Sequence, residues 1–116
     1  EDQEQVRRVT SLMLRQNGYT VIEAENGLRA LEHAASFREP IHLLLTDVVM
    51  PGMNGRDLYE ELKQMRPGIR VLYVSGYPRE IISHEGILDE GVNLLSKPVT
   101  AETLTARVRE ILDGRD

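Results

Sequence analysis

The sequence contains no cysteine, so it can form neither a disulfide framework nor a metal site with cysteine ligands. It also has no apolar run near the ~18 residues that a membrane-spanning helix requires, and no signal peptide is visible. A basic cluster is missing as well: 14 Lys and Arg residues stand against 19 Asp and Glu residues, a formal net charge of -5. We therefore expect a cytoplasmic chain that contacts neither nucleic acid nor a membrane surface.

The 116 residues are the usual size of one domain, and a chain of this length buries roughly two thirds of its unfolded surface. We expect a single domain over residues 1–116. Because the sequence begins at Glu1 without an initiator Met, we also expect it to be a piece of a longer protein.

Stretches with helical periodicity alternate with short apolar runs along the chain. The expected helices are residues 5–17 with Val6, Val9 and Met13 on the apolar face, a second after Asn26-Gly27, a third capped by Asn54, and a last one entered at Thr100. The expected strands are residues 19–24, 42–47, 70–75 and 92–96. Alternating strands and helices form a parallel sheet between helical layers, so the predicted fold class is α/β.

Three of the expected strands end in polar groups, namely Asp47, Ser75, and Lys97 just beyond the last strand. Ligands of such sheets bind beyond the carboxyl ends of the strands, so these three side chains should meet at one edge. Each residue also has an ordinary structural explanation, because Asp and Ser often form turns and Lys is usually solvated.

Four motifs in a fixed order resemble the receiver domain of two-component response regulators over essentially the whole chain. They are the acidic pair Glu1-Asp2 before the first helix, TDVVMPGMNG around Asp47, VSGY with Ser75, and SKP with Lys97. The VSGYP form is most similar to receivers attached to hybrid histidine kinases. The resemblance implies a flavodoxin-like, doubly wound parallel sheet with strand order 2-1-3-4-5, in which the first strand ends at the acidic pair. That strand is missing from the sequence, so we expect an N-terminally incomplete receiver; if this piece were the whole chain, it would be poorly stable or would exchange strands.

The resemblance implies that Asp47 accepts a phosphoryl group from a phosphohistidine of a sensor kinase or phosphotransfer protein and signals by a conformational change. Lys97 would pair with a phosphoryl oxygen, Ser75 would donate its hydroxyl to another, and the segment 76–92 would shift. The family also implies a cis peptide bond before Pro98. Apart from self-catalysed aspartyl phosphorylation and dephosphorylation, no enzyme activity is expected.

The resemblance further implies a Mg²⁺ ion, which prefers oxygen ligands such as carboxylates, carbonyls and water. Asp2 and Asp47 would be direct ligands, Glu1 would act through water, and the backbone carbonyl of Val49 would complete the protein's share.

Several alternatives remain beside this interpretation. A flavodoxin-like module for a nucleotide or flavin is disfavoured because no G-x-G-x-x-G or P-loop occurs. An aspartyl-phosphate hydrolase would carry a second Asp two residues after the nucleophile, where this chain has Val49. A degenerate receiver that acts only as a protein-interaction module stays open, and so does a homodimer.

Overall fold

The computed structural model of the chain describes residues 3–49, 52–76 and 92–114. Its elements follow the order α1 (Gln3–Gln16), α2 (Gly27–Ser36), β1 (Leu43–Asp47), α3 (Gly55–Met65), β2 (Arg70–Ser75), β3 (Leu94–Ser96) and α5 (Ala101–Leu112). The three strands are parallel and lie in the order β1-β2-β3. The predicted α/β class is confirmed, and these strands match the last three positions of the predicted order. Within the described ranges no helix is both long and apolar enough to cross a bilayer.

Two helices begin at the capping residues that the sequence predicts, and a third is capped by Asn26. The Asn54 side chain accepts a hydrogen bond from the Asp57 N–H at 2.8 Å, which confirms the predicted start of α3. Thr100 forms a reciprocal capping box with Thr103 at the start of α5. The Asn26 side chain caps α2 by accepting from the Arg29 N–H, so Asn26-Gly27 is a connection into a helix, as predicted, and not a hairpin turn.

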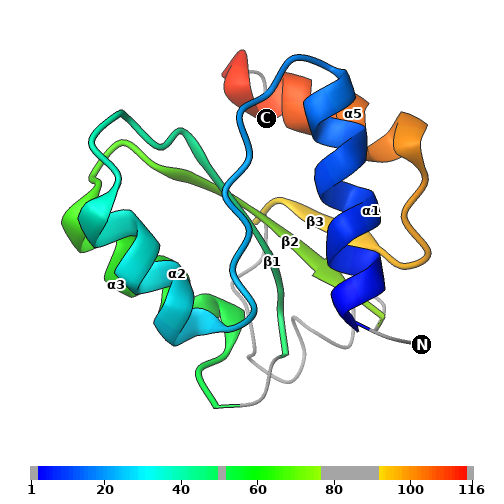
Figure 1. The fold of residues 1–116 in the computed structure, drawn as a ribbon. Coiled ribbons are helices and arrows are strands. Elements are labelled where there is room, and N and C mark those ends of the chain that lie inside the picture. The colour runs from blue at the N-terminus through cyan, green and yellow to red at the C-terminus, as the bar shows by residue number, and fades with distance from the viewer. Residues whose placement is uncertain (1–2, 50–51, 77–91, 115–116) are drawn as a thin grey trace.

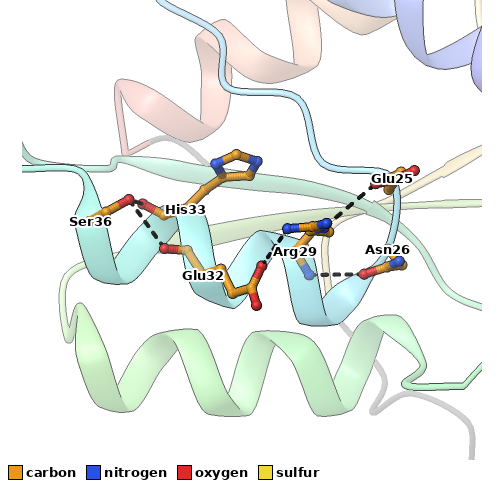
Figure 2. A network of polar contacts seen from close by, with 6 residues as sticks. All are labelled: Glu25, Asn26, Arg29, Glu32, His33 and Ser36. Atoms are coloured by element: carbon orange, nitrogen blue, oxygen red, sulfur yellow. Dashed lines mark hydrogen bonds and ion pairs between the residues drawn. The ribbon is translucent and has the colours of Figure 1, made fainter.

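The start of α2 is held by a network of polar contacts on the helix surface (Figure 2). The Asn26 side chain accepts from the Arg29 N–H at 2.8 Å. The Arg29 guanidinium in turn pairs with Glu25 at 3.6 Å and with Glu32 at 3.0 Å. Exposed pairs of this kind contribute a few tenths of a kcal/mol each, roughly 0.2–0.5. The Asn26 cap marks the residue at which α2 begins, and the ion pairs stabilise its first turns.

The helices cover the sheet on both faces, α1 with α5 on one and α2 with α3 on the other (Figure 1). Alternation along the strands sends side chains to opposite layers. Leu72 of β2 packs with Leu104, Val108 and Ile111 of α5, whereas its neighbours Val71 and Tyr73 pack with Val48 and Leu94 on the other face. On the second face the Tyr59 and Tyr73 rings meet edge to face, with centroids 6.5 Å apart. The continuous apolar runs of the sequence follow from this double covering.

The predicted strand 19–24 is wrong: the structure assigns no strand to these residues. Tyr19 and Val21 still pack on the core beside Leu72, and Glu23 pairs with Arg7 at 3.6 Å. A strand requires a backbone ladder, however, and none of the described residues pairs with this segment. The predicted order would place the first strand beside the edge of β1 that has no partner among the described strands.

The predicted apolar face of α1 is also wrong in part. Val6 is 37% and Val9 52% exposed, whereas Ser11 and Leu14 are buried and Met13 is half-buried against the core. The buried Ser11 hydroxyl has no hydrogen-bond partner in the described part of the chain. The helix packs against α5, and Leu14 and Met13, not Val6 and Val9, join the core cluster with the α5 side chains.

Leu72 provides a test of this core because its side chain is 0% exposed in the central strand. We expect Leu72→Ala to lower the free energy of unfolding by about 2–5 kcal/mol, since it removes apolar contacts and leaves a cavity. Urea unfolding measures this loss. The matched control Leu28→Ala, at a site 64% exposed, should stay within about 0.5 kcal/mol of the parent. Equal effects of the two substitutions would contradict the described core.

Candidate functional site

The register of the sheet brings the polar strand ends to one edge. Asp47 of β1 lies opposite Val74 of β2, and Ser75 lies opposite Ser96 of β3. The Lys97 N–H donates to the Ser75 carbonyl at 2.7 Å, which continues the pairing one residue beyond β3. Lys97 therefore leaves the sheet at the level of Ser75.

Lys97 and Asp47 form an ion pair at this edge, with Lys97 Nζ 3.1 Å from Asp47 Oδ1. The two side chains are 39% and 33% exposed, respectively. Pairs with this much solvent contact contribute only about 0–1 kcal/mol to stability. The fold therefore depends little on the pair, and a carboxylate and an ammonium remain accessible beside each other. The peptide bond between Lys97 and Pro98 is cis, which confirms the prediction for this bond.

Ser75 is buried at the end of β2, only 4% exposed, and follows the residue that pairs with Asp47. The backbone of Ser75 thus lies at the same end of the sheet as the Asp47–Lys97 pair. The convergence that the sequence predicts is confirmed for the Asp47 and Lys97 side chains, and Ser75 lies at the same end of the sheet.

The loop after Asp47 is tied to its surroundings through Val48, which is 1% exposed. Its N–H donates to the Val74 carbonyl at 3.0 Å, and its carbonyl accepts from the Gly55 N–H at 2.9 Å. Gly27 of α2 supports the same loop, because a Cβ at Gly27 would lie 3.1 Å from the Met53 sulfur. The next residue, Val49, is 58% exposed.

Two of the four expected metal ligands, Asp47 and the Val49 carbonyl, belong to the described residues, whereas Glu1 and Asp2 lie outside them. Residues 77–91 of the segment expected to move also lie outside. No group of three or more His, Cys, Asp or Glu side chains that could hold a metal ion occurs in the part of the chain that is described. A carboxylate followed two residues later by an exposed loop residue with a carbonyl oxygen fits the oxygen chemistry of Mg²⁺.

A cleft of about 340 Å³ is lined by residues of α1, of α2 and of the segment between them, and neither Asp47, Ser75 nor Lys97 lines it. Its walls carry charges of both signs that pair with each other, such as Arg7 with Glu23 and Arg29 with Glu25. The cleft therefore offers no excess charge for an anionic ligand. The Asp47 carboxylate instead lies at the carboxyl end of β1, where the side chain is 33% exposed and therefore accessible.

Two residues that contact the Asp47 backbone, Thr46 and Gly55, were not selected from the sequence. The Thr46 hydroxyl donates to the Asp47 carbonyl at 3.0 Å, and Gly55 packs against the same carbonyl. The available signal was Gly55 itself. Glycine destabilises a helix, so a glycine in the first turn indicates a position where a side chain does not fit.

Comparison with known proteins gives consistent results. A family model for the response regulator receiver domain matches residues 1–109. The chain is 34% identical over its full length to the sensor kinase CckA of Brucella abortus, but spans only 12% of that protein, so the likeness does not extend to the whole kinase. It is 30% identical over 97% of its length to the response regulator receiver protein CpdR of the same species, and covers 92% of it.

Solved structures show the same fold. The crystal structure of the receiver domain from the hybrid histidine kinase CckA matches with a TM-score of 0.79 and 36% sequence identity, covering 97% of this chain and 94% of that one. A response regulator from Burkholderia pseudomallei, solved with a phosphorylated aspartic acid and a calcium ion, matches with a TM-score of 0.76 at 24% identity, covering 97% of this chain and 65% of that one; this match shows the fold alone. By sequence and by fold, the chain belongs to the response regulator receiver domain family of two-component signalling.

Proposed function

We propose that Asp47 accepts a phosphoryl group from a phosphohistidine of a sensor kinase or a histidine phosphotransfer protein. Receiver domains are signalling domains that act with such proteins, and this chain belongs to that family. The observation that carries the proposal is the 3.1 Å separation of Lys97 Nζ and Asp47 Oδ1 at the carboxyl end of the sheet.

In the proposed step, an Asp47 carboxylate oxygen attacks the phosphorus of the phosphohistidine. A P–O bond forms while the P–N bond breaks, the imidazole leaves with the electron pair and takes up a proton, and Asp47 becomes an acyl phosphate. Negative charge on both reactants opposes their approach. The Lys97 ammonium lies where it offsets that charge, and Ser75 is the candidate donor to a phosphoryl oxygen of the product.

A Mg²⁺ ion would be held by Asp47, the Val49 carbonyl and Asp2, with Glu1 through water. When bound, it supplies further neutralisation of the phosphoryl oxygens. The chain's own contribution is position: the tied backbone of Val48 directs the loop, and the β2–β3 register places Lys97 beside the carboxylate.

The phosphoacceptor role predicts a covalent mass increase when the chain meets a small phosphodonor. We expect acetyl phosphate with Mg²⁺ to add one phosphoryl group to the parent chain and none to Asp47→Asn, because the amide cannot act as the nucleophile. Intact-protein mass spectrometry measures both.

The matched control is Asp57→Asn, which changes an exposed acid in the first turn of α3 and should be labelled like the parent. An unlabelled parent chain would instead support the degenerate receiver that acts only by protein contact. Equal labelling of Asp47→Asn would rule out Asp47 as the acceptor.

A second prediction concerns the lifetime of the acyl phosphate. In the receiver family the residue two positions after the acceptor flanks the path of the hydrolytic water, and here it is Val49, apolar and 58% exposed. An apolar side chain cannot orient a water molecule. We expect Val49→Asn to speed dephosphorylation roughly 10-fold, since a positioned polar group assists proton transfer and water orientation.

The decay of the phosphorylated mass after removal of the donor gives this rate. Val49→Ala is the control, because it opens the same space without adding a polar group, and it should decay like the parent. If Asn and Ala at position 49 gave equal rates, the residue at this position would not control dephosphorylation by orienting water.

A further inference from the structure

The backbone carbonyl of Asp47 is enclosed on two sides by its neighbours in the fold. On one side the Thr46 hydroxyl donates to it at 3.0 Å. Thr46 is itself buried, 7% exposed, and the hydrogen bond is partly buried, so water competes with it less than it would at the surface. The hydroxyl therefore restrains the peptide plane that carries the proposed acceptor.

On the other side stands Gly55, the first residue of α3. A Cβ built at Gly55 would fall well inside van der Waals contact with the Asp47 carbonyl oxygen and 3.1 Å from Thr46 Cγ2. Gly55 has no positive φ, unlike Gly52 with φ 77, so the requirement at Gly55 is for space and not for an unusual backbone conformation. Only glycine lets α3 begin this close to β1.

The same short stretch is fixed at its next residue, because Val48 is hydrogen-bonded both to β2 through Val74 and to Gly55. The backbone on both sides of the Asp47 carboxylate is thus held from three elements, β1, β2 and α3. Reactions between positioned groups lose rate steeply when one group moves, by up to about 100-fold for a shift near 1 Å. Precise placement of the carboxylate beside Lys97 therefore depends on these contacts.

We propose that Thr46 and Gly55 are positioning residues for Asp47: the Thr46 hydroxyl and the missing side chain of Gly55 together set the direction of the acceptor carboxylate. This inference rests on the proposed phosphoacceptor function. It assigns neither residue a contact with the phosphodonor, so both act through the backbone of Asp47.

The test measures the phosphorylation rate by acetyl phosphate over a range of donor concentrations, with Mg²⁺ held constant and each variant shown to be folded by circular dichroism. We expect Gly55→Ala to lower the maximal rate by about 10- to 100-fold, because the new methyl group displaces the Asp47 carbonyl. Thr46→Val, which keeps the shape but removes the hydroxyl, should lower it about 10-fold, and Thr46→Ser should restore it to within about 3-fold of the parent. The half-saturating donor concentration should stay unchanged, since neither residue binds the donor.

Two controls match the substitutions away from the site. Gly68→Ala adds a methyl group where nothing lies within 4 Å, and Thr105→Val removes a hydroxyl that donates to the Ala101 carbonyl at 2.8 Å within α5. Both should be labelled at the parent rate.

The outcomes separate this inference from the function on which it rests. An unlabelled parent chain defeats the phosphoacceptor function and this inference with it. A labelled parent together with folded Gly55→Ala and Thr46→Val chains that react at its rate overturns the positioning role alone. If Gly55→Ala does not fold, the Thr46 pair decides: a Ser variant as slow as the Val variant would overturn the role of the hydroxyl.

Discussion

The parallel register of β1, β2 and β3 is the constraint on which the rest of the structure depends. It sets Asp47 opposite Val74 and Ser75 opposite Ser96, so the ends of three strands lie at one level. The hydrogen bond from the Lys97 N–H to the Ser75 carbonyl extends this register to the lysine. A slip of one residue in either strand pair would reverse the faces of the side chains and separate the carboxylate from the ammonium.

The core enforces that register from both sides of the sheet. Leu72 points into the layer of α1 and α5, and its neighbours Val71 and Tyr73 point into the opposite layer, so a shifted pairing would have to repack the core on both faces of the sheet. The rigid core meets the site at Val48, which is buried next to the partly exposed Asp47. The Asp47 carboxylate is thus partly exposed, while the residue next to it is packed in the core. A protein partner can reach the carboxylate, and the carboxylate keeps a fixed position, which agrees with the family to which the chain belongs.

Sequence reasoning predicted the parts of the fold that local patterns encode. The apolar runs gave β1 and β2, the caps Asn54 and Thr100 marked helix starts, and the polar strand ends predicted the meeting of Asp47 and Lys97. It failed at residues 19–24. The amino-acid composition there is typical of a strand, but a strand also needs hydrogen bonds to a neighbouring strand, and composition does not show whether that neighbour is present. It also missed Thr46 and Gly55, since their contacts with the Asp47 carbonyl depend on the approach of α3 to β1, a distance that no sequence period records.

Locating the phosphoryl group on the chain tests the central claim most directly. An acyl phosphate is reduced by borohydride, which converts the modified aspartate to homoserine and leaves free carboxylates unchanged. After phosphorylation, reduction and proteolysis, peptide mass spectrometry should find homoserine at position 47 and unchanged aspartate at all other Asp positions. Homoserine at another position, or at none while the intact chain carries phosphate, would contradict the account.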